Sequence, residues 1–326
     1  MRVLTGIKPT NILHLGNLFG GLLPAVQLQA EHQVMMMVAD LHAITVPQKP
    51  EELRANIAFA VAAYLAAGID PKKTILFQQS QVPAHTELGW ILECQTKMGE
   101  AERMTQYKDK VSSKGESVSV GLFTYPMLMA ADILLYETEA VPVGADQKQH
   151  LELTRDLAER LNRDFGTNLP LPQPLIRAEG ARIMSLDDPT VKMSKSAPSE
   201  KSYISLLDDA ETVNKKIKAA VTDSIMGISL DDARPGVKNL LTLKALCTGE
   251  SVEKVALKFA DSGMKDFKEA TAAAINTFLE PLQARLKGYL TEPASLREIL
   301  AAGSAQARQI ATPQIDTLKE KIGLTL

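Results

Sequence analysis

The chain has few cysteines and no long apolar run, and each absence excludes a class of protein. Cys94 and Cys247 are the two cysteines among 326 residues, too few for a disulfide framework or for a four-cysteine zinc or iron–sulfur site. That count favours a reducing, cytoplasmic setting. The longest apolar stretches, residues 34–39 and 59–67, are far shorter than the roughly 20 residues that span a bilayer. The opening residues MRVLTGIKP break too soon for a signal peptide.

An excess of charge of either sign is also missing. Lys and Arg number 36 against 39 Asp and Glu, a formal net charge of -3, so the overall charge gives no indication of a nucleic-acid partner, although a local basic face can still bind one. Hydrophobic residues make up 45% and charged residues 23%, the balance of a soluble globular protein. At about 150 residues per domain, the length suggests roughly two domains.

Strand-like apolar runs and helical patterns alternate along the first half of the chain. Strands are expected at residues 2–5, 34–39, 74–78 and 141–143, and helices at 15–31, 51–67, 84–97 and 147–163. This alternation predicts an α/β fold with a parallel sheet. The proline-rich segment 170–174 is expected to be a surface loop.

Beyond Ser194 the sequence becomes helical and lysine-rich, with no strand pattern of any strength. Helices are expected at residues 208–220, 239–248, 251–262, 265–287 and 293–322, the last one broken near Pro313. We therefore predict an α/β domain over residues 1–186 and an all-helical C-terminal domain over residues 187–326. The final helical stretch can belong to either domain.

The segment GIKPTNILHLGN, residues 6–17, follows the first expected strand. Ligands of open parallel sheets bind beyond the carboxyl ends of the strands. Gly16 would let a flat nucleotide approach the backbone, and His14 and Asn17, three residues apart, would point the same way on a helical turn. On spacing alone, an ordinary strand-to-helix loop with a surface histidine remains the simpler interpretation.

Two lysines three residues apart mark the segment VKMSKSAPS, residues 191–199. Lys192 and Lys195 can place ammonium groups on polyphosphate oxygens, where charge develops during phosphoryl or nucleotidyl transfer. A mobile loop would close this clamp only over bound substrate. A solvated basic loop is the alternative.

One carboxylate stands in a strongly apolar setting. Tyr125, Met129, Asp132 and Tyr136 fall at i, i+4, i+7 and i+11, which is one helical face. An acid among such neighbours is costly unless it is paired. Asp132 either accepts a hydrogen bond from a flat ligand bearing one N–H or O–H, or forms a salt bridge on a core helix. Asp146, near an expected helix start, similarly can bind a ribose hydroxyl or merely cap the helix.

Taken together, these segments resemble a known family. LHLGN at residues 13–17 resembles the HIGH motif of class I aminoacyl-tRNA synthetases, with Asn17 in place of the last histidine, and KMSKS stands complete at residues 192–196. The segments ADLHAIT (39–45), YPMLMAADILLY (125–136), VPVGADQKQHLELTRDLAERLN (141–162) and GARIMSL (180–186) closely resemble bacterial tryptophanyl-tRNA synthetases. The resemblance runs from Val3 to about Ala220 and continues more weakly to the end.

The resemblance implies a Rossmann-like catalytic domain and a helical domain that binds the tRNA anticodon. The implied reaction joins ATP, carried with Mg²⁺, to L-tryptophan as tryptophanyl-adenylate, with release of pyrophosphate. Tryptophan then passes to tRNA(Trp). A homodimer without a prosthetic group is implied, with each tRNA spanning both subunits.

The same resemblance assigns residues to sites. Those matching the ATP site are Lys8, Pro9, Thr10, His14, Gly16, Asn17, Gly144, Ala145, Asp146 (at the ribose), Ile183 (at adenine), Lys192, Met193, Ser194, Lys195 and Ser196. Those matching catalytic lysines at the phosphates are Lys110, Lys192 and Lys195. Those matching the tryptophan site are Asp132 (at the indole N–H), Met129, Tyr125, His42, Gln147, Val141, Val143 and Leu4. No residue is expected to bind a metal directly.

The chain departs from the family pattern in three places. Lys8 stands where many members carry Gln, Asn11 replaces a common Gly, and Leu4 replaces a common Phe in the indole pocket. The first adds a positive charge near ATP, and the last leaves the pocket shape open. Outside these motifs, Trp90 is expected to pack in the core, and His32, His85 and His150 are interpreted as scattered residues without metal spacing.

Three other functions compete with this interpretation. A tyrosyl-tRNA synthetase shares KMSKS, but the segment around Asp132 argues against it. A small nucleotidyltransferase without tRNA would be shorter, since it lacks the long helical part. A non-catalytic paralogue would have little need to keep both lysines of KMSKS.

Overall fold

A five-stranded parallel sheet forms the centre of the molecule. The computed structural model describes residues 1–10, 13–104, 119–144, 147–175, 183–194 and 199–325. Its strands lie in the order β3-β2-β1-β4-β5. They span Arg2–Ile7 (β1), Gln33–Val38 (β2), Ile75–Gln78 (β3), Ala140–Val141 (β4) and Gln173–Pro174 (β5). The predicted parallel α/β fold is therefore confirmed.

The central strands owe their position to apolar side chains on both faces. In β2 every residue from Val34 to Val38 is buried, as a strand covered by helices on both sides requires. The prediction for residues 170–174 was wrong, because this segment is not wholly a loop and pairs with β4 through β5. Pro174 is tolerated because β5 is an outer strand, where a missing N–H removes no ladder bond.

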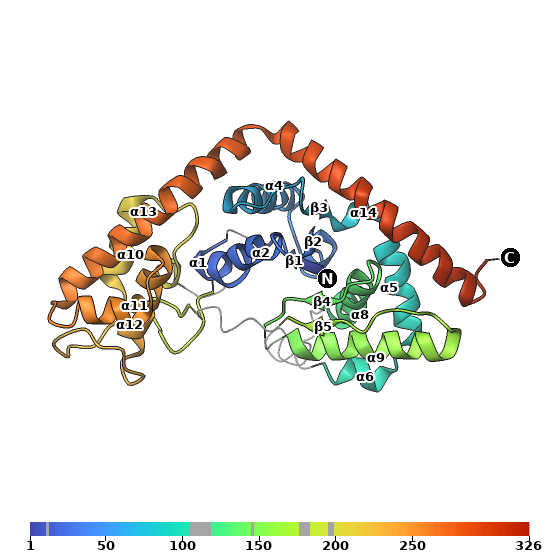
Figure 1. Ribbon diagram of the computed structural model, residues 1–326, viewed down its shortest axis with the longest axis horizontal. Coiled ribbons are helices and arrows are strands. Elements are labelled where there is room, and N and C mark those ends of the chain that lie inside the picture. The colour runs from blue at the N-terminus through green and yellow to red at the C-terminus, as the bar shows by residue number, and fades with distance from the viewer. Residues whose placement is uncertain (11–12, 105–118, 145–146, 176–182, 195–198, 326) are drawn as a thin grey trace.

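Helices cover the sheet (Figure 1). They span Leu15–Asn17 (α1), Leu23–Leu28 (α2), Asp40–Ala43 (α3), Pro50–Ala67 (α4), Ala84–Gln95 (α5), Met98–Glu102 (α6), Val120–Leu134 (α8) and Lys148–Phe165 (α9), with a π-helical turn at Leu18–Leu22 (η1) and a 3₁₀ turn at Gln79–Gln81 (η2). Helix α4 shows how closely local sequence sets the ends: it begins at Pro50, and Gly68 follows its end with a left-handed φ of 112°.

The C-terminal part is helical, as predicted. Its helices span Ala210–Ala219 (α10), Pro235–Thr248 (α11), Val252–Lys258 (α12), Met264–Thr291 (α13) and Pro293–Lys321 (α14), with a 3₁₀ turn at Glu200–Ser202 (η4). Helices α13 and α14 form two long arms above the sheet, and α10 to α12 gather along the outer part of α13 (Figure 1). Among the described residues, no helix is long and apolar enough to cross a membrane.

The predicted break near Pro313 was wrong, because α14 runs unbroken through it. Pro313 is exposed, whereas Ala311 and Ile315 beside it are buried in a core cluster. This packing offsets the backbone hydrogen bond that proline removes.

Helix α14 packs directly on β3. A Cβ at Gly303 would lie 1.9 Å from the Leu76 carbonyl oxygen, so only glycine permits this approach. Gln78 N–H donates to Ser304 Oγ over 3.2 Å. The final helix therefore lies against the α/β part of the chain, while a domain boundary at residue 186 stays a prediction.

Candidate active site

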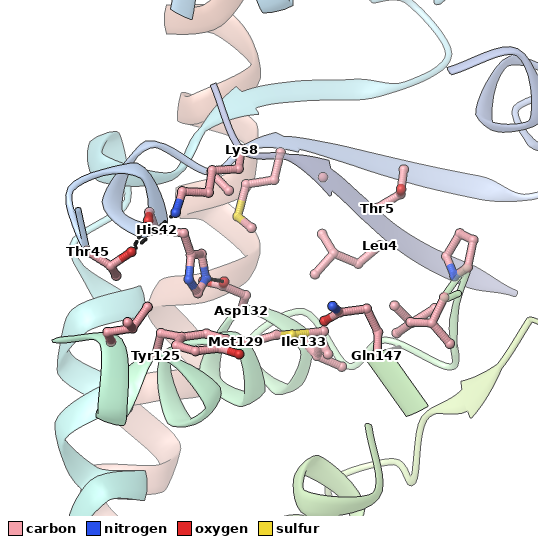
Figure 2. Close-up of a pocket in the computed structure, with 17 residues that line it drawn as sticks. Leu4, Thr5, Lys8, His42, Thr45, Tyr125, Met129, Asp132, Ile133 and Gln147 are labelled. Carbon is pink, nitrogen blue, oxygen red and sulfur yellow. Dashed lines mark hydrogen bonds and ion pairs between the residues drawn. The ribbon is translucent and has the colours of Figure 1, made fainter. Parts of the chain in front are cut away.

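A cavity of about 380 Å³ opens at the carboxyl ends of β1, β2 and β4. Because these strands are parallel, the segments that follow them meet at one edge of the sheet. Figure 2 shows Leu4 and Lys8 on the β1 side facing Tyr125, Met129 and Asp132 on α8. All eight residues that the sequence assigned to the amino-acid site line this cavity: Leu4, His42, Tyr125, Met129, Asp132, Val141, Val143 and Gln147.

Asp132 is the most buried charged group of the cavity wall. Its side chain is 2% exposed. Oδ1 accepts a hydrogen bond from Gln79 Nε2 over 2.7 Å and lies 2.6 Å from His85 Nδ1. Oδ2 lies 2.8 Å from His42 Nε2. A carboxylate has about four acceptor positions, so three neighbours leave room for one more donor from the cavity.

These contacts keep Asp132 ionised. Burial by itself raises the pKa of the carboxyl, but the neighbouring histidines His85 and His42 outweigh that cost and lower the pKa to about 2. The structural interpretation is confirmed, because Asp132 is paired inside the fold, whereas the hydrogen bond to a flat ligand stays a prediction for a residue that also lines the cavity. A fixed negative charge in an apolar cavity selects a ligand with a matching donor.

Positive and polar groups lie at the opposite wall. Lys8 Nζ donates to Thr45 Oγ1 over 3.2 Å, and Thr45 Oγ1 donates to the His42 carbonyl over 2.8 Å (Figure 2). Lys8, which the sequence assigned to ATP, therefore borders the same cavity as the amino-acid residues. Tyr125 presents its ring to His42, with centroids 6.2 Å apart.

Three histidine and tyrosine positions differ from their sequence interpretation. His85 and His150 are not merely scattered: His85 contacts Asp132, and His150 Nε2 lies 2.8 Å from the Tyr125 hydroxyl. Tyr136 follows the end of α8 at Leu134 and does not line the cavity; its hydroxyl lies 2.7 Å from His85 Nε2 instead.

The expectation that Trp90 packs in the core was wrong. Its side chain is 67% exposed. Helix α5 buries His85, Leu88 and Leu92, and Trp90 lies off that face.

Gln79 and His85 are among the residues at the site that the sequence did not reveal, as are cavity-lining residues such as Thr45. Gln79 is fully buried, and its Oε1 accepts from the Leu41 N–H over 3.1 Å. Neither residue stands in a motif or at a spacing that relates it to Asp132. The available signal was weak: a buried acid requires polar partners, but sequence does not say which.

The two signature segments lie side by side. A Cβ at Gly16 would lie 3.6 Å from Met193 Cβ. It would also lie 2.8 Å from Cε1 of His14, so the histidine ring occupies the space beside the glycine. Asn17 Oδ1 accepts from the His14 N–H over 3.1 Å, which caps the first turn of α1. The motifs distant in sequence are thus joined in space.

A backbone hydrogen bond and apolar packing join the second motif to Ile183 and Leu13. Met193 N–H donates to the Ile183 carbonyl over 3.0 Å, and Leu13, Ile183 and Met193 share one core cluster. Lys192 and Gly144 are exposed, while Pro9 is buried and Thr10 and Ser194 are half-buried. Five assigned residues lie outside the described residues: Lys110, Ala145, Asp146, Lys195 and Ser196.

Comparison with known proteins matches this arrangement. Residues 1–280 match the family model of tRNA synthetases class I (W and Y). A tryptophan–tRNA ligase of Halalkalibacterium halodurans is 49% identical over 323 residues, covering 99% of this chain and 97% of that protein. The tryptophanyl-tRNA synthetase of Mycoplasma pneumoniae has a similar crystal structure, with a TM-score of 0.91, 38% identity, and coverage of 99% of this chain and 98% of that one. The enzyme of Campylobacter jejuni, complexed with ADP and tryptophan, has a TM-score of 0.86, 38% identity, and coverage of 99% and 100%.

Proposed function

The chain belongs to the class I tRNA synthetases for tryptophan and tyrosine, and we propose that the cavity around Asp132 is its L-tryptophan site. Full-length similarity to tryptophan–tRNA ligases gives the activity. The chain activates L-tryptophan with ATP and transfers it to tRNA(Trp). The observation that carries the site assignment is the ionised carboxylate of Asp132 on an apolar wall.

Recognition of the side chain follows from this geometry. The indole N–H donates to Asp132 Oδ2, while Leu4, Met129 and Val141 pack against the ring. Phenylalanine has no such donor and leaves a buried carboxylate short of one partner. A site built to pair a polar substrate group rejects the analogue lacking it by on the order of 10⁴-fold.

Activation requires ATP beside this cavity. We place ATP along residues 8–17 and 192–196, a placement supported by the contact of Gly16 with Met193 and by Lys8 at the cavity wall. A carboxylate oxygen of tryptophan attacks the α-phosphorus, and the bond to the β-phosphate oxygen breaks as pyrophosphate leaves. Lys110, Lys192 and Lys195 neutralise the charge that builds on the leaving group. Mg²⁺ enters with ATP as part of the substrate.

We also propose a domain division, an oligomeric state and a cellular location for the chain. Residues 1–186 form the catalytic domain and residues 187–326 carry the KMSKS loop and the helices that bind the tRNA anticodon. The chain acts as a homodimer in the cytoplasm, with each tRNA spanning both subunits. These statements rest on the family resemblance. Sedimentation at micromolar protein checks the dimer, and a fully active monomer would overturn it.

ATP–pyrophosphate exchange with each of the twenty amino acids tests the proposed substrate. Exchange dependent on tryptophan alone is expected, followed by charging of tRNA(Trp). Exchange that depends on tyrosine would identify a tyrosyl-tRNA synthetase. Tryptophan-dependent exchange without charging would indicate a nucleotidyltransferase, and binding without exchange a regulatory paralogue.

A further inference from the structure

Three fully buried polar side chains form a line behind the cavity. Tyr136 and His85 have no exposed surface, and Asp132 is 2% exposed. The Tyr136 hydroxyl lies 2.7 Å from His85 Nε2, and His85 Nδ1 lies 2.6 Å from Asp132 Oδ1. The ring centroids of Phe77 and His85 lie 6.0 Å apart with an interplanar angle of 17°. This stacked arrangement holds the imidazole in its plane.

We propose that His85 and Tyr136 are positioning residues for tryptophan recognition: Tyr136 O–H donates to His85 Nε2, which fixes the imidazole proton on Nδ1, facing Asp132 Oδ1. The inference rests on the proposed role of Asp132 at the indole N–H. It assigns a role to two residues that do not line the cavity.

The proton assignment follows from what each nitrogen can reach. Within the described part of the chain, His85 Nδ1 is buried without a regular hydrogen bond, and the charged atom beside it is Asp132 Oδ1, at 2.6 Å. A bare lone pair on Nδ1 would face an anion at 2.6 Å. Burial raises the pKa of Tyr136, as does the negative charge of Asp132, so the phenol keeps its proton and can donate it. With its proton on Nδ1, the ring faces the carboxylate with a donor, and its Nε2 can accept from the Tyr136 hydroxyl.

The arrangement also decides which carboxylate oxygen meets the substrate. Gln79 cannot exchange its amide ends, because its Oε1 accepts from the Leu41 N–H. Gln79 Nε2 and His85 Nδ1 therefore both face Oδ1. The remaining acceptor position belongs to Oδ2, which His42 shares on the cavity side. Without the donor from His85, both the charge and the orientation of the carboxylate would be less well defined.

The groups that face Asp132 come from several elements. They are His42 from α3, Gln79 from η2, His85 from α5 and Tyr136 beyond α8. Tyr125 from α8 and Lys8 beyond β1 line the same cavity. Since replacing His85 leaves His42, Tyr125 and Lys8 in place, a comparison with the native chain isolates the effect on Asp132.

Nitrogen-15 NMR of the full-length chain labelled at its five histidines tests the proton assignment without any substrate. We expect His85 to carry its proton on Nδ1, with assignment by loss of its signals in His85→Gln. In Tyr136→Phe a population with the proton on Nε2 should appear. An unprotonated Nδ1 in the native chain would overturn the proposal.

Steady-state kinetics test whether His85 positions Asp132 for tryptophan recognition. In His85→Gln the KM for tryptophan should rise about tenfold, with the KM for ATP within about twofold. Removal of this donor raises the pKa of Asp132, so the loss should be deepest at the acid end of the measurable pH range. His85→Asn, whose shorter amide can donate from the Nδ1 position, should recover most of the affinity.

Tyr64→Phe is the matched control for Tyr136→Phe, since Tyr64 is a buried tyrosine on α4 in the other core cluster. Tyr64→Phe should leave the proton of His85 on Nδ1 and should leave the KM values for tryptophan and ATP unchanged. A folded His85→Gln whose tryptophan KM and pH profile equal the native ones would refute the positioning role. If Asp132→Asn in the same assay still impairs tryptophan use, only this inference fails; if Asp132→Asn has no effect, the proposed site itself fails.

Discussion

Replacing Asp132 with asparagine keeps the size of the side chain but removes its charge and one acceptor. The structure predicts how the new amide would lie. Gln79 Nε2 and His85 Nδ1 both face Oδ1 at 2.7 and 2.6 Å, and Gln79 is held by the Leu41 N–H. The amide carbonyl must therefore take the place of Oδ1, so its NH₂ group faces His42 and the cavity.

The amide NH₂ group, a donor, then faces the indole N–H at the position where the native chain has the anionic acceptor Oδ2. Loss of one charge-assisted hydrogen bond costs about 1.5–3 kcal/mol. We therefore expect kcat/KM for tryptophan to fall roughly 10- to 150-fold, with nearly normal ATP binding. Discrimination against phenylalanine should relax, because the variant has no unpaired carboxylate to penalise it.

Pyrophosphate exchange of the purified variant with tryptophan, tyrosine and phenylalanine measures these effects. Thermal melting establishes that the variant is folded. An unchanged kcat/KM for tryptophan in a folded variant would leave Asp132 as a structural acid. Specificity would then have to come from the shape of the cavity walls.

Further predictions concern catalysis, packing and pH. Lys195→Ala should lower the rate of adenylate formation far more than it weakens tryptophan binding, because its charge meets the leaving pyrophosphate only in the transition state; a roughly tenfold higher KM for tryptophan with unchanged turnover would contradict this. Gly303→Ala should destabilise the fold by about 1–3 kcal/mol in chemical denaturation, since its Cβ would lie 1.9 Å from the Leu76 carbonyl oxygen. The control Gly288→Ala on α13, where an added Cβ would have nothing within 4 Å, should stabilise the fold by about 0.5–1 kcal/mol. Equal effects of the two substitutions on stability would disprove the packing argument. Asp132, with its pKa lowered from 3.8 to about 2, contributes about 2–3 kcal/mol of stability above pH 5 that is lost as pH falls toward 2. Denaturant titrations of the native chain and of Asp132→Asn should therefore show a difference in stability that shrinks over that pH range. A difference that does not depend on pH would count against the low pKa of Asp132.

Local patterns predicted the frame of the site well. The continuous apolar run of β2 fits a strand covered on both faces, and Pro50 and Gly68 mark the ends of α4. The eight residues assigned by resemblance to the amino-acid site line one cavity. Such features depend on neighbours in sequence or on motifs, so they can be seen without the fold.

What the sequence did not reveal depends on contacts between distant elements. Gln79 and His85 become partners of Asp132 only when η2 and α5 pack beside α8. Tyr136 contacts His85 instead of lining the cavity. In α14, tertiary packing overrides the usual effect of Pro313. In each case burial, which no local pattern encodes, decides the outcome.

The packing of α14 on β3 also affects how copies of the chain can associate. An outer strand with free backbone groups invites another strand to pair with it, which is a route to aggregation. Here the Gln78 N–H is already bonded to Ser304, and Gly303 brings the helix backbone against Leu76. At the opposite side of the sheet, β5 is two residues long and ends in Pro174, which has no N–H to offer. Within the described part of the chain, neither side of the sheet is suited to strand addition, so any association of two copies would have to use side-chain surfaces. A chain truncated within α14 would expose β3 as a template for intermolecular β-pairing.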